Sequence, residues 1–352
     1  MTVVSIRASR PYEVKIEAGL LARAGEEIAA LYPAPRTALI VTDDTVNALY
    51  GDALANSLVR AGFAISRFVF AHGERSKSIQ TLSNLWNTLA AKCFTRTDLI
   101  VALGGGVCGD LAGFAAATYL RGIPVVQIPT TLLAMVDSSV GGKTAVDLPA
   151  GKNLIGAFYQ PSLVLCDPAL LRTLPSAVFA DGCAEVIKYG YINDQALLEM
   201  LQIPFDRAPD AVIARCVADK RDLVQCDEQD RGVRQLLNLG HTAGHALEIC
   251  SNFEISHGSA VAIGMLLMAR AAARLHLCTP DVPPHMEALL RTYALPTKCP
   301  FDAAALAGAA LSDKKREGNT LTLVLPSSLG QSVLHPIPTD ELEHFFAMGL
   351  CD

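Results

Sequence analysis

The first half of the chain alternates short runs rich in Val, Ile and Leu with stretches of helical periodicity. Candidate strands lie at 36–41, 64–70, 98–103, 124–128 and 162–166. Continuous apolar runs of this length are typical of strands that are covered on both faces, and parallel sheets with crossover helices provide that cover. The pattern therefore predicts a doubly wound α/β domain with a largely parallel sheet.

The second half has a different period. After residue 175 the apolar residues recur at three- and four-residue spacing as far as about residue 311, which is typical of amphipathic helices. We therefore predict an α/β domain at 1–175 followed by a mainly α-helical C-terminal domain at 176–352. Alternating residues at 320–326, followed by SSLGQSVLH, predict a short hairpin near the end of the chain.

The composition excludes several classes of protein. The 352 residues carry a net charge of −6, with 51% hydrophobic and 18% charged residues. This balance excludes nucleic-acid binding through bulk positive charge and lies outside the disordered range. The longest uncharged stretch, 318–339, is interrupted by Pro and Gly, so it cannot form a membrane-spanning helix. The ten cysteines form no CxxC pair, which favours free thiols in a reducing cytoplasm.

A glycine-rich segment follows the strand predicted at 98–103. Gly104, Gly106 and Gly109 have GxGxxG spacing and precede a helical pattern. In such a turn the bare backbone amides at a helix N-terminus approach a pyrophosphate. The segment therefore predicts a Rossmann-like dinucleotide site, although a turn selected only for packing gives the same pattern.

The acidic residue that usually contacts the ribose is missing from its expected place. Position 129, about twenty residues on, is Pro. Asp43, which follows an earlier strand, and Glu74 with Lys77 are alternative contacts for the ribose or adenine. Each of these is also compatible with a solvated charge on a loop.

Two Gly-Lys pairs lie close together at 141–144 (GGKT) and 151–153 (GKN). The first is not a Walker motif, because Asp137 stands where that motif needs a glycine. Backbone amides next to Lys143 and Lys152 still suit a phosphate group, with each lysine acting as a point charge. The pairs therefore predict a phosphate site, with solvated loops as the alternative.

Histidines cluster in the second half. His241 and His245 are four residues apart, which places both on one face of a helix, and His257 follows twelve residues later. His257 or Glu185 would complete three protein ligands for a zinc-type metal with one open position. Thr at position 242 excludes the HExxH protease motif. The alternative to a metal site is that the two helical histidines only make ordinary hydrogen bonds within the protein.

Several cations accompany these histidines. They are Lys188, Lys220, Arg234 and the pair Lys314 and Lys315, with Asn238 one turn after Arg234 on the same helical face if the helix extends that far. Separately they are typical of a solvated surface. Together they indicate a site for an anionic substrate.

The segments that carry these residues resemble one family over roughly residues 36–325. GGGVCGDLAGFAAATYLRG, PTTLLAMVDSSVGGKTAVDLPAGKNLIGAFYQP, EVIKYG, LLNLGHTAGHA, HGSAVAIGM and SDKK occur in the order and spacing of the 3-dehydroquinate synthase family. The resemblance implies a carbon–oxygen lyase that converts 3-deoxy-D-arabino-heptulosonate 7-phosphate to 3-dehydroquinate. It also implies NAD, a divalent metal (zinc or cobalt), an NAD-binding α/β domain before a helical domain, and a cytoplasmic homodimer in the shikimate pathway.

The resemblance also implies roles for individual residues in binding the metal and the cofactor. The implied metal ligands are Glu185, His241 and His257, whereas His245 faces the substrate, in contrast to the interpretation from spacing alone. The positions that match NAD contacts are Asp43, Glu74, Lys77, Gly105, Gly106, Val107, Asp110, Thr130, Thr131, Lys143, Lys152 and Thr173.

The positions that match the substrate pocket are Arg121, Lys143, Asn153, Lys220, Arg234, Asn238 and Lys314, together with the proton-handling Asp137, Lys188 and His245. In the family, Lys143 and Asn153 hold the phosphate, with Arg121 reaching in from a second subunit. Lys220 and Arg234 hold the carboxylate of the substrate.

One position departs from the family pattern. Where HGE is common after the last metal ligand, this chain has His257, Gly258 and Ser259. A lost carboxylate that oriented the histidine would weaken metal affinity about 10- to 100-fold. The alternative is that Ser259 lies outside the layer that contacts the ligands and changes nothing.

Three other functions compete with this interpretation. A sibling sugar phosphate cyclase, such as 2-deoxy-scyllo-inosose synthase or 2-epi-5-epi-valiolone synthase, acts on a substrate without the carboxylate, so Lys220 and Arg234 argue against it. A metal-dependent polyol dehydrogenase would release NADH and would not need the phosphate pocket. A binding protein on an inactive scaffold is disfavoured because all the expected ligands and cations are present.

Overall fold

The computed structural model describes residues 1–33, 36–205, 209–311, 316–317 and 319–350. Their contacts divide the chain into two compact units, the first comprising Met1–Leu174 with Arg207–Gln229 and the second Pro175–Asp206 with Asp230–Asp352. The predicted limits of 1–175 and 176–352 differ from this division in one segment, because α8 (Asp210–Cys226) groups with the first unit.

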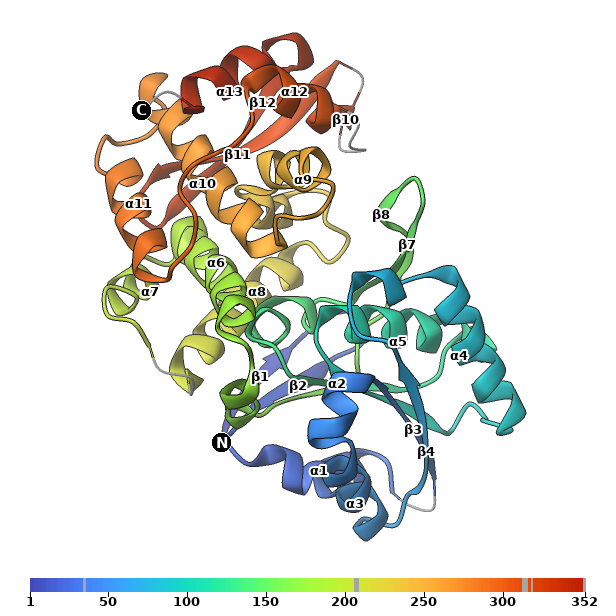
Figure 1. The fold of residues 1–352 in the computed structure, drawn as a ribbon. Coiled ribbons are helices and arrows are strands. Elements are labelled where there is room, and N and C mark those ends of the chain that lie inside the picture. Colours follow the sequence, from blue (N-terminus) through green and yellow to red (C-terminus); the bar gives the residue numbers. More distant parts are fainter. Residues whose placement is uncertain (34–35, 206–208, 312–315, 318, 351–352) are drawn as a thin grey trace. The chain divides into compact units, whose positions relative to one another are not determined.

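The first unit is built on a twisted, mostly parallel sheet (Figure 1). Among the described residues it has seven strands in the order β1-β2-β9-β6-β5-β3-β4. Their bounds are β1 (Thr2–Ile6), β2 (Tyr12–Ile16), β3 (Thr37–Asp43), β4 (Ala64–Phe70), β5 (Leu99–Gly104), β6 (Val125–Pro129) and β9 (Leu163–Cys166). Only β1 and β2 pair in antiparallel fashion. The predicted Rossmann-like, largely parallel sheet is therefore confirmed.

The central strands are buried on both faces. Every residue of β5 and β6 is buried, because helices cover the sheet on each side. Leu39, Val41, Ile100 and Ala102 form one apolar cluster with α4 and α5. The helices of this unit are α1 (Ala24–Leu31), α2 (Asp44–Val46), α3 (Asp52–Arg60), α4 (Ile79–Ala91), α5 (Gly106–Thr118) and α8.

A hairpin extends from this unit at the two Gly-Lys pairs. β7 (Lys143–Leu148) and β8 (Gly151–Phe158) pair in antiparallel fashion, and Figure 1 shows them projecting beyond the sheet. A Cβ added at Gly156 would lie 2.1 Å from the carbonyl oxygen of Thr144. The two Gly-Lys pairs therefore lie at the starts of two paired strands, which the sequence did not predict, and the phosphate site stays a prediction.

The second unit is mainly helical, as predicted. Its helices are α6 (Ser176–Asn193), α7 (Gln195–Met200), α9 (His241–Cys250), α10 (His257–Arg274), α11 (Val282–Thr292), α12 (Ala303–Leu311) and α13 (Leu342–Leu350). α10 is buried along most of its length and packs against α6, α9, α11 and α13. The predicted late hairpin is present as β11 (Thr320–Ser328) and β12 (Gln331–Pro338), with the short β10 (Arg316–Glu317) beside it.

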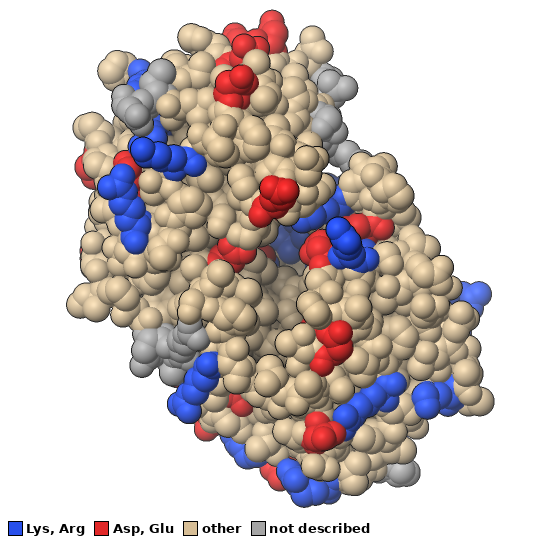
Figure 2. Space-filling view, in the orientation of Figure 1, with Lys and Arg blue, Asp and Glu red and all other residues tan. Residues whose placement is uncertain are grey.

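The surface and the cysteines agree with the composition. On the face drawn in Figure 2, acidic and basic side chains are interspersed, and the described residues form no broad basic surface there. No described helix is long and apolar enough to cross a membrane. The nine described cysteines are free, although Cys93 and Cys226 are exposed rather than buried.

Asp98 fixes the start of two neighbouring strands, and its replacement tests the sheet. Its carboxylate accepts hydrogen bonds from the backbone amides of Thr95 (2.7 Å) and Thr37 (3.0 Å). Burial raises the pKa of Asp98, but these hydrogen bonds outweigh burial and lower it overall. We expect Asp98→Ala to reduce the free energy of unfolding by about 2 kcal/mol at pH 7.

The pH dependence of that loss follows from the lowered pKa of Asp98. The carboxylate stabilises the fold fully above its unfolded pKa of about 3.9, and the stabilisation is lost as the pH falls through the lower folded pKa. Urea unfolding at pH 7 and near pH 3 measures the difference. Asp52→Ala is the control, because the Asp52 side chain is 88% exposed; an equal loss at both pH values would contradict the prediction.

Candidate active site

The glycine-rich turn joins β5 to α5. Gly105 directly precedes α5, which begins at Gly106. A Cβ at Gly109 would lie 2.7 Å from Oε1 of Gln127 on β6, and a Cβ at Gly105 would lie 3.0 Å from Cγ2 of Thr131. A larger residue at position 109 would therefore have to displace the side chain of Gln127. The amides at the N-terminus of α5 lie beside the loop that follows β6, which is the arrangement expected of a dinucleotide site.

Neighbouring NAD candidates lie around the same turn. Val107 is in the first turn of α5, and Asp110 follows one turn after the start of the helix. The backbone amide of Thr130 donates to the carbonyl of Gly104 at 3.0 Å, which joins the ends of β5 and β6. The structure therefore brings the predicted turn and the predicted threonines together at one edge of the sheet.

Lys77 is buried, and its ammonium links α5 to the hairpin β7–β8. Its Nζ lies 2.5 Å from Oδ2 of Asp110 and donates to Oδ1 of Asn153, also at 2.5 Å. The backbone amide of Asn153 donates to Oδ1 of Asp147 at 2.8 Å. Burial opposes the ammonium, but the carboxylates of Asp110 and Glu74 outweigh burial and raise the pKa of Lys77. Lys77 therefore stays charged and holds Asn153 in place.

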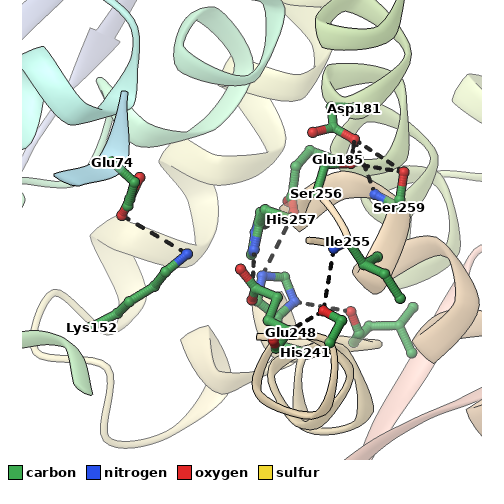
Figure 3. A network of polar contacts seen from close by, with 12 residues as sticks. Glu74, Lys152, Asp181, Glu185, His241, Glu248, Ile255, Ser256, His257 and Ser259 are labelled. Carbon is green, nitrogen blue, oxygen red and sulfur yellow. Dashed lines mark hydrogen bonds and ion pairs between the residues drawn. The ribbon is translucent and has the colours of Figure 1, made fainter. Parts of the chain in front are cut away.

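Glu74 and Lys152 face each other at the edge of this network, as Figure 3 shows. Nζ of Lys152 lies 4.0 Å from Oε1 of Glu74. Burial raises the pKa of Glu74, and the two lysines oppose that effect. The predicted cofactor residues Glu74, Lys77, Asp110 and Lys152 are thus neighbours in the first unit.

Two further NAD candidates have structural contacts of their own. The Asp43 carboxylate accepts from the amide of Val46 at 2.8 Å and so caps α2. Thr173 ends the 3₁₀ helix η6 (Pro168–Thr173), and its hydroxyl lies 2.6 Å from that of Tyr50. Their roles in binding NAD stay predictions.

Asp137 and Lys220 form a pair within the first unit. Nζ of Lys220, on α8, lies 2.8 Å from Oδ1 of Asp137 and donates to the backbone carbonyl of the same residue at 2.7 Å. Lys220 is buried. The family resemblance implies separate roles for these residues, whereas the structure shows that each fixes the position of the other.

Three side chains of the second unit converge on one point (Figure 3). They are Glu185 on α6, His241 at the start of α9 and His257 at the start of α10, and their ligand atoms lie within 4.8 Å of one another. Oε1 of Glu185 lies 3.6 Å from Nε2 of each histidine. Two imidazoles and one carboxylate are the donor set of catalytic zinc sites that keep an open position. The residues present therefore fit a divalent metal.

In His241 and His257, the ring nitrogen Nδ1, which is not the one that faces Glu185, lies near a hydrogen-bond acceptor. Nδ1 of His257 lies 3.3 Å from Oε2 of the buried Glu248, and Nδ1 of His241 lies 3.2 Å from the carbonyl of Leu239. A donating Nδ1–H leaves Nε2 available as a ligand. Burial opposes a charged imidazole, but Glu185 and Glu248 outweigh it and raise the pKa of His257 to about 10. The two carboxylates therefore favour a positive charge at this position, which either a proton or a metal cation can supply.

Lys188 lies one turn after Glu185 on α6. Its Nζ forms an ion pair with Oε2 of Glu185, and both side chains are buried. The pairing places the predicted proton-handling lysine directly beside the carboxylate of the metal cluster.

His245 lies within reach of the same centre. It forms a second cluster of ligand atoms with Glu248 and His257, again within 4.8 Å. The ring centroids of His241 and His245 are 5.5 Å apart. Both predictions for His245, as a ligand and as a residue that faces the substrate, are compatible with this position.

Arg234 and Asn238 do not share a helical face with the histidines. They lie on the 3₁₀ helix η7 (Val233–Asn238), and the chain then turns at Gly240 (φ 78°) before α9 begins. In a 3₁₀ helix, residues three apart are aligned and residues four apart are not. The condition for a shared face, an α-helix that extends through these residues, is therefore not met, although the buried Arg234 stays a substrate candidate.

The other predicted substrate residues are spread over the chain. Lys143 is exposed at the start of β7, and Arg121 ends the short 3₁₀ helix η4 (Tyr119–Arg121) with a left-handed φ of 66°. Lys314 lies outside the described residues.

Ser259 does not contact the metal cluster through its hydroxyl. Its Oγ lies 3.4 Å from Oδ1 of Asp181 on α6. The carboxylate that orients His257 comes from Glu248 instead. The HGS sequence therefore leaves the orientation of His257 intact.

Known proteins resemble this chain over nearly its whole length. The family model described as "3-dehydroquinate synthase N-terminal" matches residues 67–181, and the model described as "3-dehydroquinate synthase C-terminal" matches 182–316. The 3-dehydroquinate synthase of Caulobacter vibrioides is 47% identical over 338 residues, which cover 92% of this chain and 91% of that protein. The chain belongs to the 3-dehydroquinate synthase family.

Solved structures of sibling enzymes share the fold. A 2-deoxy-scyllo-inosose synthase complexed with carbaglucose-6-phosphate, NAD+ and Co2+ has a TM-score of 0.87 and 25% identity, covering 99% of this chain and 100% of that one. The 2-epi-5-epi-valiolone synthase of Streptomyces hygroscopicus subsp. jinggangensis 5008, with NAD+ and Zn2+ bound, has a TM-score of 0.86 and 29% identity, covering 98% of each chain. This chain is thus more similar in sequence to 3-dehydroquinate synthases than to either sibling.

Three residues of this family member were missed by sequence reasoning. Glu248 lies at i+7 from His241 and at i+3 from His245, on the same helical face, so its spacing carried a signal. Asp147 carried none, because its contact with Asn153 depends on the hairpin β7–β8, which the sequence did not predict. Asp181 carried none, because its contact with Ser259 depends on how α6 and α10 pack.

Proposed function

We propose that this chain converts 3-deoxy-D-arabino-heptulosonate 7-phosphate to 3-dehydroquinate and phosphate, as a carbon–oxygen lyase acting on phosphates. The observation that carries the proposal is the cluster of Glu185, His241 and His257 in a chain that is 47% identical to a 3-dehydroquinate synthase. The NAD+ and Co2+ or Zn2+ of the sibling structures support the same two cofactors here.

The two cofactors have complementary chemistry. When both are bound, a divalent metal polarises a substrate hydroxyl and NAD accepts a hydride and later returns it. Glu185, His241 and His257 are the proposed metal ligands, and Glu248 holds the Nδ1 proton of His257. The proposal thus assigns the metal to the second unit.

The first unit is proposed to bind NAD and the phosphate of the substrate. Gly105 and Gly106 present backbone amides at the start of α5, and Lys77 fixes Asn153 at the start of the second hairpin strand. Lys143 and Asn153 would bind the phosphate as charge and hydrogen-bond donors. The remaining proposed NAD contacts are Asp43, Glu74, Val107, Asp110, Thr130, Thr131, Lys152 and Thr173.

Two of the residues proposed to transfer protons are held in place by ion pairs with neighbouring side chains. Asp137 is held by Lys220, and Lys188 is held by Glu185, so each would face a substrate with little reorganisation. Lys220 and Arg234 are proposed to bind the substrate carboxylate, with Asn238, Lys314 and His245 contributing to the pocket.

Phosphate release tests the proposal. Purified protein with NAD and zinc or cobalt is expected to release inorganic phosphate from the heptulosonate phosphate without net formation of NADH, because the hydride is returned within each turnover. A malachite-green phosphate assay and absorbance at 340 nm measure the two quantities. Stoichiometric NADH would instead indicate a dehydrogenase, and turnover of glucose 6-phosphate or sedoheptulose 7-phosphate would indicate a sibling cyclase.

The proposal includes two copies of the chain in the cytoplasm. Arg121 of one copy would reach the phosphate pocket of the other, as the family resemblance implies. The left-handed backbone at Leu120 and Arg121 gives this turn a defined shape on the surface of the first unit. Sedimentation of Arg121→Ala, together with its phosphate-release activity, separates assembly from catalysis.

A further inference from the structure

A carboxylate from α6 lies at the start of α10, the helix that begins with His257. Oδ1 of Asp181 accepts hydrogen bonds from Oγ of Ser256 at 2.6 Å and from the backbone amide of Ser259 at 3.1 Å. Oγ of Ser259 also lies 3.4 Å from it. Ser256 is the residue that would normally cap α10, but its hydroxyl donates to Asp181 instead. The N-terminus of α10 is therefore capped by a side chain of α6, that of Asp181 (Figure 3).

The sequence at the start of α10 explains why a carboxylate from another helix is needed there. Ser256 and position 259 occupy the two key places of a capping box, which takes Ser or Thr first and Glu or Gln three residues later. Ser259 removes the acidic half of that box. A carboxylate at a helix N-terminus also interacts favourably with the helix dipole. Asp181 supplies this negative charge from outside the helix.

Asp181 also sits between two members of the metal cluster. It precedes Glu185 by four residues on α6, and so lies on the same face one turn away. A Cβ at Gly258 would lie 2.3 Å from the backbone oxygen of Asp181, so α6 and α10 are in tight contact next to His257. One residue thus connects the turn that carries Glu185 with the turn that carries His257.

We propose that Asp181 is a positioning residue of the metal centre, which fixes His257 relative to Glu185 by capping α10 from α6. The inference rests on the metal site proposed above. His257 is the first residue of α10, and the first turn of an uncapped helix frays because its amides lack partners. Loss of the cap would therefore displace a ligand while the buried remainder of α10 stays folded.

Cobalt binding is the direct test. We expect Asp181→Ala to weaken Co2+ binding roughly tenfold, because partners that orient ligands have effects of that order. Competition with a chromogenic chelator measures the dissociation constant, and the visible spectrum of bound Co2+ reports ligand geometry. Asp181→Asn, which keeps an acceptor but loses the charge, should fall between the parent and Asp181→Ala. NAD affinity should stay within about twofold of the parent.

A relocated carboxylate provides a rescue experiment. Ser259→Glu completes the capping box, so the double variant Asp181→Ser with Ser259→Glu should recover cobalt binding to within about threefold of the parent. Ser259→Glu alone should bind cobalt no more tightly than the parent, because the new carboxylate would face Asp181. Cobalt binding by the double variant no tighter than in Asp181→Ser would overturn the capping argument.

Asp302→Ala is the matched control for a purely structural cap. Asp302 caps α12, accepting from the amide of Ala305 at 2.8 Å, and α12 carries none of the proposed ligands. This variant should lower stability in urea without changing cobalt affinity or the cobalt spectrum. If Asp181→Ala behaves in the same way, Asp181 is only structural and the inference fails.

The experiment separates this inference from the proposed function. Glu185→Ala should lose cobalt binding if the metal site is correct. Should Glu185→Ala retain the parent affinity, the metal site itself is wrong. If cobalt binding is lost in Glu185→Ala but unchanged in Asp181→Ala and Asp181→Asn, only the role of Asp181 is overturned.

Discussion

Replacing Glu185 with alanine is expected to abolish metal binding and to lower the rate of phosphate release at least a thousandfold. A bound metal supplies several kcal/mol of transition-state stabilisation, and about 4 kcal/mol corresponds to a factor of roughly a thousand. Glu185 provides the carboxylate of the cluster and faces both histidines at 3.6 Å. Metal content by mass spectrometry and phosphate release with saturating NAD measure the effect.

The variant needs a folding control because Lys188 is the ion-pair partner of Glu185. Removing one member of a buried pair costs about 3–5 kcal/mol, whereas replacing both with apolar groups is often neutral. Glu185→Leu combined with Lys188→Met, which replaces both charged groups with apolar ones, should therefore unfold at a urea concentration near that of the parent but remain without metal. Retention of one equivalent of metal by this folded double variant would refute the assignment of Glu185.

Glu248→Gln is the matched comparison for the two overlapping clusters. It keeps Glu185, His241 and His257, but it weakens the hydrogen bond that orients Nδ1 of His257. We expect one metal to bind about 10- to 100-fold more weakly. If Glu248→Gln instead loses the metal while Glu185→Ala retains it, the ligands are His245, Glu248 and His257.

Much of the fold was predictable because it depends on local periodicity. The strands at 36–41, 98–103 and 124–128 appear in the structure as β3, β5 and β6, since continuous apolar runs have few other stable environments. The hairpin β7–β8 was missed because its strands begin with Gly-Lys pairs and no residue of β8 is buried. An exposed strand lacks the apolar run by which a buried strand is predicted.

The site was only partly predictable for a related reason. Glu185, His241 and His257 are far apart in sequence, and the resemblance named them before the structure placed them within 4.8 Å of one another. The pair of Asp137 with Lys220 could not be foreseen, because it depends on α8 packing in the first unit rather than with the other helices. Contacts of this kind come from tertiary packing, which spacing along the chain does not encode.

Replacing Arg234 with alanine is expected to weaken binding of the heptulosonate phosphate about 10- to 150-fold while NAD affinity stays within about twofold. A hydrogen bond to a charged group contributes about 1.5–3 kcal/mol, and 1.4 kcal/mol is a factor of ten. Arg234 is 1% exposed, so solvent cannot take the place of its guanidinium. Steady-state kinetics and isothermal titration with NAD measure the two affinities.

The carboxylate assignment is tested by the choice of ligand and by the split between KM and kcat. Sedoheptulose 7-phosphate lacks the carboxylate, so Arg234→Ala should leave its weak binding unchanged. Arg234→Lys should recover only part of the affinity for the heptulosonate phosphate, because lysine lacks the planar guanidinium that binds a carboxylate through two hydrogen bonds. Lys220→Ala should also lower kcat, since it removes the ammonium that holds Asp137 at 2.8 Å. Equal losses of NAD and substrate affinity in Arg234→Ala would show that Arg234 supports the fold rather than the substrate carboxylate.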